Sequence, residues 1–168
     1  MSILRTLALL FALSALLIVP SHAQAQGQDG KIKIEKFNHS EWTKGIFSEA
    51  VTVSNIGNAK LVYLAGVGAE DENGKRGDIR YPGDFLAQCK YAYDKIKRVL
   101  GQHGATLADV VKVTTYLTDL RYRLTMGKCI GESWDGVTFP VHTLIGVAAL
   151  AFPEMIVEVD VTAVVAAK

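Results

Sequence analysis

Residues 139–150 read FPVHTLIGVAAL, and a second segment, residues 156–160, follows closely and reads IVEVD. Both segments are rich in apolar and β-branched residues and contain few polar ones, a composition typical of strands that border a core. A break at residues 152–154, which include Pro153, separates them. We expect the two segments to form adjacent strands. That arrangement would bring the imidazole of His142 and the carboxylate of Glu158 to the same end of a sheet.

The rest of the chain alternates further strand patterns with two helical ones. Apolar residues recur every three to four positions from Phe85 onward, which predicts a helix that ends near Gly101 or Gly104. A second helix is predicted over residues 120–132, with a loop at 131–139. Strands are predicted at residues 31–37, 46–53, 60–64, 109–117, 143–150 and 156–165, with a hairpin turn at 55–58. This order favours an α+β domain with both helices on one face of a mixed sheet.

The first 25 residues have the pattern of a cleavable secretory signal peptide. One basic residue, Arg5, precedes an apolar run over residues 6–19, and the small residues around Ala23 and Ala25 suit a signal peptidase. The run is short for a membrane span, so a retained anchor is the less favoured alternative. The sequence therefore predicts a signal peptide (1–25), an N-terminal extension (26–44) and one domain (45–168). We expect the mature protein in the periplasm or outside the cell.

Cleavage after residue 25 would leave a mature chain with 17 basic and 17 acidic side chains, and hence no net charge. Proteins that bind nucleic acids or anionic membranes usually carry an excess of positive charge. We therefore expect no nucleic-acid partner, and no membrane association once the signal peptide is removed.

Cys89 and Cys129 both fall in predicted helices. An oxidising compartment would allow them to pair, but the sequence does not show whether their Cα atoms come close enough. A disulfide therefore stays an open question at this point. The histidines at 39, 103 and 142 are scattered and no Cys-x-x-Cys motif is present, so no metal site is expected.

Two stretches of the sequence resemble the RidA (YjgF/YER057c/UK114) family. The first, residues 104–120, reads GATLADVVKVTTYLTDL, and the second combines PVHT at 140–143 with VEV at 157–159. They occur in the family's order and spacing, and the resemblance extends over about residues 46–163. It implies a chorismate-mutase-like α+β fold that assembles as a homotrimer with clefts between subunits. It also implies hydrolysis of reactive 2-imino or enamine acids, such as 2-aminoacrylate and 2-iminobutanoate, to 2-oxo acids and ammonia, without a metal or an organic cofactor.

The resemblance also assigns site residues. Glu158 matches the carboxylate that orients the attacking water, and Gly66 with the backbone of Thr143 and Leu144 would line the same cleft. His142 stands where the family signature Pro-x-Arg has an arginine that grips the substrate carboxylate. We therefore expect Glu158 and His142 to be catalytic, and His142, Thr143, Leu144 and Gly66 to bind a small-molecule substrate.

The replacement of the signature arginine by His142 changes what the cleft can bind. Imidazole has at most two diverging N–H donors and is charged only when protonated, whereas guanidinium forms two parallel, always-charged hydrogen bonds. Loss of such a charge-assisted pair costs about 1.5–3 kcal/mol of binding free energy. Three hypotheses remain open. The first is that the imine substrate lacks an α-carboxylate, and the second is that the site needs acid pH to charge His142. The third is that the protein is a non-catalytic RidA-like module that binds a small molecule or a protein.

Overall fold

The computed structural model describes residues 31–38, 44–45 and 48–166. The predicted signal peptide, with its cleavage positions at Ala23 and Ala25, lies outside the described residues, as does part of the predicted extension at 26–44. None of the helices in the described ranges combines the length and the apolar character needed to cross a membrane.

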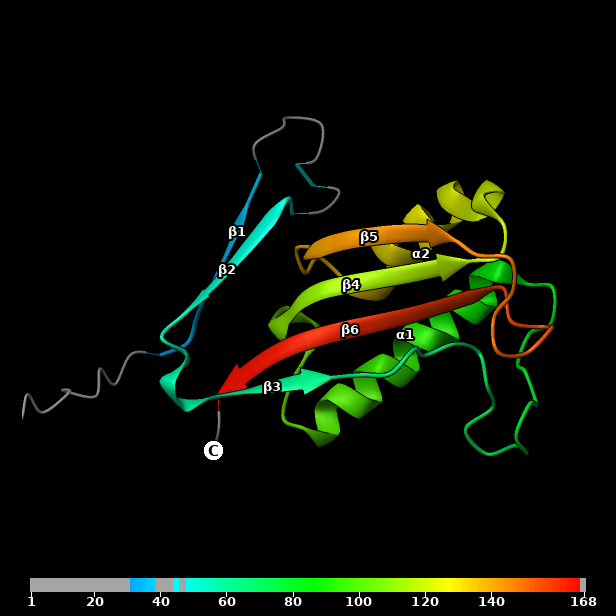
Figure 1. Ribbon diagram of the computed structural model, residues 1–168, viewed down its shortest axis with the longest axis horizontal. Coiled ribbons are helices and arrows are strands. Elements are labelled where there is room, and N and C mark those ends of the chain that lie inside the picture. The colour runs from blue at the N-terminus through cyan, green and yellow to red at the C-terminus, as the bar shows by residue number, and fades with distance from the viewer. Residues whose placement is uncertain (1–30, 39–43, 46–47, 167–168) are drawn as a thin grey trace, which may run out of the picture.

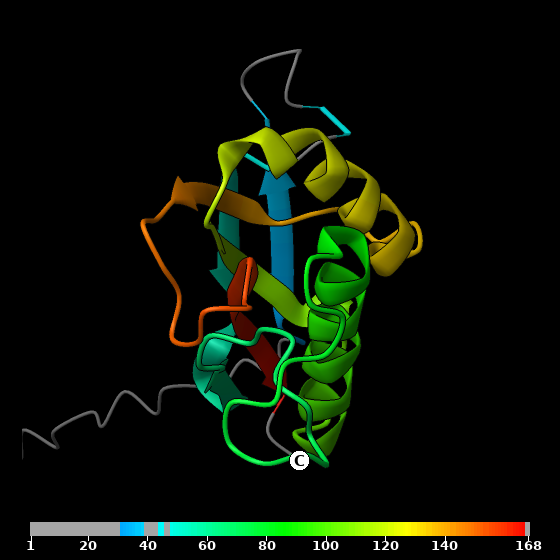
Figure 2. The ribbon, with the colours of Figure 1, turned by 90° about the vertical axis from the view of Figure 1, so that its right-hand side faces the viewer.

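The main sheet is mixed and carries two α-helices on one face. Its elements are β3 (Ala59–Tyr63), α1 (Phe85–Gln102), β4 (Val110–Leu117), α2 (Arg123–Trp134), β5 (Val141–Gly146) and β6 (Val157–Ala166). The strand order is β3-β6-β4-β5, with β4 parallel to β5 and antiparallel to β6 (Figure 1). Both helices lie on the same side of this sheet (Figure 2). The predicted α+β architecture is therefore confirmed.

α1 forms where the sequence predicts it, because its apolar residues recur on one side. Asp84 caps the first turn by accepting a hydrogen bond from the backbone N–H of Ala87 at 3.0 Å. The side of the helix that faces the sheet is completely buried and comprises Cys89, Ala92, Tyr93, Ile96 and Leu100. Burial of this apolar area, more than helix propensity, stabilises α1.

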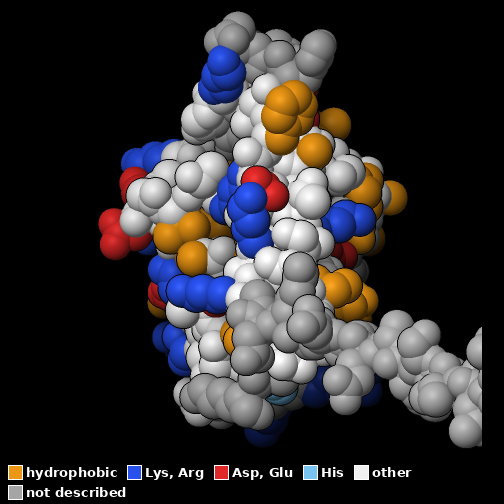
Figure 3. Space-filling view, turned by 90° about the vertical axis from the view of Figure 1, so that its left-hand side faces the viewer, with side chains coloured by type: hydrophobic (Ala, Val, Ile, Leu, Met, Phe, Trp, Pro, Cys, Tyr) orange, Lys and Arg blue, Asp and Glu red, His pale blue; other side chains and the backbone are white. Residues whose placement is uncertain are grey.

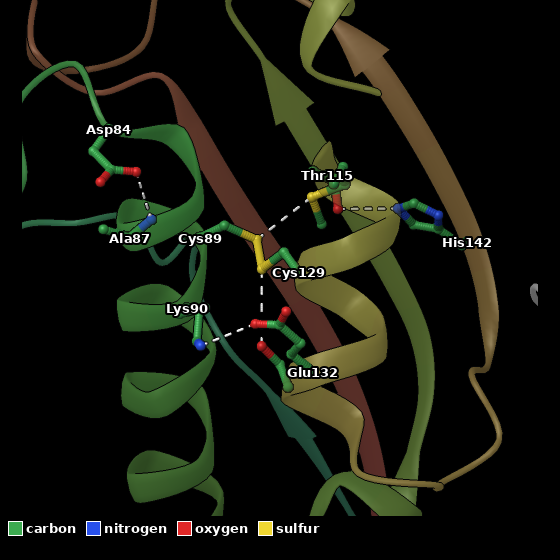
Figure 4. The surroundings of a disulfide bond; sticks show 10 residues. Asp84, Ala87, Cys89, Lys90, Thr115, Cys129, Glu132 and His142 are labelled. Carbon is green, nitrogen blue, oxygen red and sulfur yellow. Dashed lines mark hydrogen bonds and ion pairs between the residues drawn. A yellow bond between two sulfur atoms is a disulfide. The ribbon is translucent and has the colours of Figure 1, made fainter. Parts of the chain in front are cut away.

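A disulfide bond between Cys89 and Cys129 joins α1 to α2 (Figure 4). The Cα atoms of the two residues lie 6.3 Å apart, and both side chains are completely buried. The question that the sequence left open is thereby answered. The two helices pack against each other, which brings their cysteines within bonding reach.

Successive side chains of β6 point to opposite faces of the sheet. Val157, Val159 and Val161 are at most 1 % exposed and belong to the core under the helices. Glu158 and Asp160, which alternate with them, are half-buried and point to the opposite face, which no helix covers. We call this second face the open face of the sheet.

The predicted hairpin at residues 55–58 is wrong. β2 (Ala50–Ser54) pairs with β1 (Lys33–Phe37) in a separate two-stranded sheet that stands apart from the main one (Figure 1). Asn55 has a left-handed φ of 58°, but the next residues, Ile56–Asn58, form a 3-10 turn that leads the chain away from β2. β3 pairs with β6 instead, which brings Val62 into the core, a gain that a local hairpin would not provide.

The expected adjacency of the last two strands is also wrong, because β4 lies between β5 and β6. β4, α2 and β5 form a parallel crossover, and a crossover of this length brings its second strand beside its first. The antiparallel β6 then pairs with the other edge of β4.

Two predicted boundaries shift for reasons of burial and turn geometry. Leu120–Tyr122 form a 3-10 turn before α2, and α2 continues to Trp134 instead of ending at residue 132. Trp134 is 2 % exposed and packs edge-on against Phe139, so its burial extends the helix into the predicted loop. β5 ends at Gly146, four residues before the predicted end.

Candidate active site on the open face

Glu158 lies on the open face near the start of β6, an inner strand of the sheet. It is opposite Tyr116 of β4 in the strand register, and Asp160 follows on the same face of β6. Tyr116 donates its phenolic hydrogen to Oδ2 of Asp160 over 3.2 Å. The open face thus presents two carboxylates and a phenol side by side.

Gly66 lies directly against the carboxyl group of Glu158. A Cβ atom on Gly66 would fall 1.7 Å from Oε1 and 2.6 Å from the carboxyl carbon of Glu158, so any larger residue here would force the carboxyl group of Glu158 to move. The approach is fixed by the next residue, since Val67 and Val159 exchange backbone hydrogen bonds of 2.9 and 3.0 Å. The structure therefore brings together two of the residues that the sequence placed in one cleft.

The surroundings of Glu158 favour its protonated form. Burial raises the pKa of this carboxyl group, and the nearby negative charges of Glu70 and then Asp160 raise it further. The same electrostatic field raises the pKa of the Tyr116 phenol, mainly through Asp160. A raised pKa makes a carboxyl group a stronger base when it is ionised, which suits a group that takes up a proton in general acid–base catalysis.

His142 lies on the opposite, helix-covered face. Its Nε2 atom is 3.0 Å from Oγ1 of Thr115, a completely buried side chain, and its ring meets Phe139 edge-on (Figure 4). The strand register agrees, because His142 pairs with Val113 of the core whereas Glu158 pairs with Tyr116 of the open face. The expectation that His142 and Glu158 face one another is therefore wrong. It failed because it rested on adjacent strands, and β4 separates them.

Burial also determines the charge of His142. Desolvation lowers the pKa of the imidazole from 6.5 to about 4. The ring is therefore neutral at pH 5.5 and above. The hypothesis that mild acid restores a cation at this position loses its physical basis.

The other two expected binding residues separate in the same way. Thr143 is exposed and pairs with Thr114, so it lies on the open face with Glu158. Leu144 pairs with Thr115 and its side chain packs against the core. The contribution of their backbone to a cleft stays a prediction.

Glu70 and Tyr116 were not predicted from the sequence as neighbours of Glu158. Period-two alternation along the strand does place Asp160 on the same side as Glu158, although the sequence suggested only a surface role for it. Glu70 comes near Glu158 only through the fold, because 88 positions separate the two residues.

In the described ranges, no group of three or more His, Cys, Asp or Glu side chains is arranged to hold a metal ion. Four cavities of about 310–490 Å³ lie along the helices and loops, and neither Glu158 nor His142 lines any of these four.

Comparison with known proteins agrees with this architecture. The family model described as endoribonuclease L-PSP matches residues 41–165. A RutC family protein of Pyrococcus abyssi is 32 % identical over 119 residues, which cover 71 % of this chain and 86 % of that protein.

Two solved structures are similar over most of the chain. One is YyfB of Yersinia pestis, a protein of unknown function of the conserved Rid protein family, at 29 % identity and a TM-score of 0.68, with 80 % of this chain and 98 % of that chain covered. The other is a Mycobacterium tuberculosis member of the YjgF/YER057c/UK114 family, at 30 % identity and a TM-score of 0.53, with 79 % and 100 % covered. On the strength of the family match across most of its length, the chain belongs to the RidA (YjgF/YER057c/UK114) family.

Proposed function

We propose that the protein hydrolyses neutral or cationic imines and enamines without an α-carboxylate to carbonyl compounds and ammonia, with Glu158 as the catalytic carboxyl group. The observation that carries this proposal is the approach of Glu158 to Gly66 on the open face, where burial and two acidic neighbours raise the pKa of Glu158.

The reaction moves both protons of one water molecule, and an enamine enters it after tautomerising to its imine. Ionised Glu158 accepts a proton from water while the water oxygen bonds to the imine carbon and the C=N electron pair moves to nitrogen, and the protonated carboxyl group then passes that proton to nitrogen. In the resulting amino alcohol, Glu158 accepts the hydroxyl proton as the carbonyl group forms and transfers it to the departing nitrogen as the C–N bond breaks, so that a neutral imine gives a carbonyl compound and ammonia and an iminium ion gives a carbonyl compound and ammonium. Glu158 ends the cycle ionised, and no redox partner or cofactor enters this balance. A pKa above the ordinary value suits a group that must take and return a proton.

Charge selects against 2-imino acids. The groups that act on Glu158 are two carboxylates, Glu70 and Asp160, and a substrate carboxylate would add a third negative charge. His142 is neutral and lies on the other face, so it offers no counter-charge. An iminium ion, in contrast, is attracted by the same groups.

Three copies of the chain would complete the site. The open face leaves large apolar side chains in water, with Leu61 57 %, Tyr63 71 % and Ile145 38 % exposed. Exposed apolar side chains on an uncovered sheet favour association. We propose a homotrimer whose neighbouring copies cover this face and close a cleft over Glu158. Sedimentation equilibrium should give three times the chain mass, and Ile145→Asp should yield monomers.

The proposed setting is the periplasm or the extracellular space. The disulfide between Cys89 and Cys129 supports this, because such bonds persist in oxidising compartments. Mass spectrometry of the exported protein should find an N-terminus at residue 24 or 26.

The face of the protein shown in Figure 3 is a poor match for RNA. Figure 3 shows the face that carries the β1–β2 hairpin, where lysine and arginine side chains are dispersed among acidic and hydrophobic ones. A polyanion partner would favour a continuous basic surface. This supports a small-molecule substrate over the nuclease activity in the description of the family model.

A non-catalytic binding module is the second candidate. The position of His142 favours it, because the arginine that would grip a substrate is replaced by a neutral ring turned toward the helices. Such a module would retain the cleft and bind a small molecule or a protein without turning it over.

Ammonia release from two imines generated in situ distinguishes the candidates. One imine is butan-1-imine, made from butylamine by an amine oxidase, and the other is 2-iminobutanoate. We expect kcat/KM to be at least about tenfold higher for butan-1-imine, the range that loss of a charge-assisted pair implies. No rate above buffer with either imine would favour the binding module.

A further inference from the structure

Lys95 of α1 reaches across to the segment that follows β3. Its ammonium group donates to the backbone oxygens of Gly68 at 3.1 Å and Glu70 at 2.9 Å, and to Oε2 of Glu70 at 2.9 Å. An ammonium group has three N–H donors, and all three are used here. The side chain is 14 % exposed, so these contacts are largely shielded from water.

Glu70 closes the same arrangement from the other side. Its Oε2 atom also accepts a hydrogen bond from the backbone N–H of Gly68 at 3.1 Å. The preceding residue, Val67, is bonded in both directions to Val159 of β6. The segment is therefore fixed to α1 through Lys95 and to β6 through Val67, and Gly66 directly precedes this doubly fixed stretch.

Two neighbouring ion pairs provide a contrast. Asp71 pairs with Arg80, and Glu72 pairs with Arg98, in the acidic run that continues from Glu70. The arginine side chains of these pairs are 48 % and 49 % exposed, and ion pairs exposed to this degree contribute little to stability. Of the three basic residues in these ion pairs, Lys95 is therefore the one whose removal should displace the segment that follows β3.

We propose that Lys95 and Glu70 are positioning residues for Glu158: they hold the segment of residues 66–70 against β6 and keep a second carboxylate beside the first. This inference rests on the proposed role of Glu158 in imine hydrolysis.

The proposal has an electrostatic consequence. The titratable groups that face Glu158 are Glu70 from this segment, Asp160 from β6 and Tyr116 from β4. Replacement of Glu70 by glutamine keeps an oxygen that can accept from Lys95 and Gly68 but removes one of the two negative charges. The pKa of Glu158 should therefore fall, and the acidic limb of the rate profile should move to lower pH with it.

The test uses the full mature chain with Glu70→Gln, Lys95→Met and Arg98→Met as the matched control. Carboxyl-labelled glutamate allows the pKa of Glu158 to be followed by carbon NMR, assigned with Glu158→Gln, whether or not the protein is active. We expect Glu70→Gln to lower that pKa and Arg98→Met to leave it unchanged. Lys95→Met should increase amide hydrogen exchange at residues 66–70 and lower kcat/KM about tenfold to a hundredfold.

The result that would overturn the inference is an unchanged pKa of Glu158 in Glu70→Gln together with unchanged exchange at residues 66–70 in Lys95→Met. Failure of the proposed function looks different. In that case the NMR and exchange effects would appear in proteins that release no ammonia.

Discussion

Nε2 of His142 lies 3.0 Å from Oγ1 of Thr115, on the face of the sheet that is turned away from Glu158. The residue that replaces the family's signature arginine is thus engaged in the core, and the candidate catalytic carboxyl group stands without it.

His142→Arg should not create activity toward 2-iminobutanoate. An arginine at this position would begin on the helix-covered face, where a charge is costly to bury, so we expect a loss of about 1–3 kcal/mol of unfolding free energy. Urea denaturation and ammonia release measure both effects. His142→Gln, which can still bond to Thr115, is the control. A large gain of deaminase activity in His142→Arg would show that the side chain reaches the site after all.

The protein should become less stable as the pH is lowered, because of His142. Its pKa in the folded protein, about 4, lies below the ordinary 6.5, so the unfolded chain takes up the proton first as the pH falls. The contribution of the neutral ring is complete above pH 6.5 and is lost between pH 6.5 and about 4, by at most about 3 kcal/mol. Urea denaturation across this range should show a shallower pH dependence in His142→Gln. The same change at the exposed His103 is the control, and an identical slope in wild type and His142→Gln would contradict the assignment.

Gly66→Ala should disable the site while the fold persists. The new methyl group would fall 1.7 Å from Oε1 of Glu158 and must displace that carboxyl group. We expect kcat/KM to drop about a hundredfold, as for other misplaced catalytic groups. Gly57→Ala, whose methyl group would meet no atom within 4 Å, should retain full activity. Equal activity of the two variants would remove Gly66 from the site.

Loss of the disulfide should destabilise the protein markedly. Cys89 and Cys129 are 40 residues apart, and the chain-entropy model assigns about 4 kcal/mol to a loop of that length. Urea denaturation of the Cys89→Ala, Cys129→Ala double variant measures the loss, and thiol titration of the unfolded wild type should detect no free cysteine. Two titratable thiols in the protein isolated from its natural compartment would rule out the bond.

The sequence was sufficient to predict the helices and the sheet class, because these depend on local periodicity. The spacing of apolar residues after Phe85 fixes α1, and the alternation around Glu158 fixes β6. The pairing of strands was harder to predict. β3 pairs with β6, which buries Val62, and β5 pairs with β4 through a helical crossover. Both pairings join segments that are far apart in the sequence.

Some residues of the candidate site could likewise be predicted from the sequence, whereas others depend on long-range contacts. Gly66 and Glu158 were found by resemblance and do meet in space. The face on which His142 lies depends on a strand register that one sequence does not determine, since a shift of one residue reverses every side chain. Glu70 and Lys95 reach the site through tertiary contacts alone.

Glu158→Gln should separate stability from activity. Because the folded protein raises the pKa of this carboxyl group, ionised Glu158 is a liability to stability above that pKa, and its removal should raise Tm at pH 7.5. Thermal unfolding at pH 7.5 provides the measurement and shows that the variant is folded. A lower Tm than wild type would contradict the direction of the pKa shift.

The central claim is that chemistry occurs at Glu158 on the open face and does not involve His142. The most direct measurement is kcat/KM for butan-1-imine hydrolysis by Glu158→Gln and His142→Gln under identical conditions. We predict a loss of about a hundredfold to ten-thousandfold for Glu158→Gln, the usual range for a general acid–base group, and a change of less than about twofold for His142→Gln. Equal losses in the two variants, or a larger loss in His142→Gln, would contradict the account.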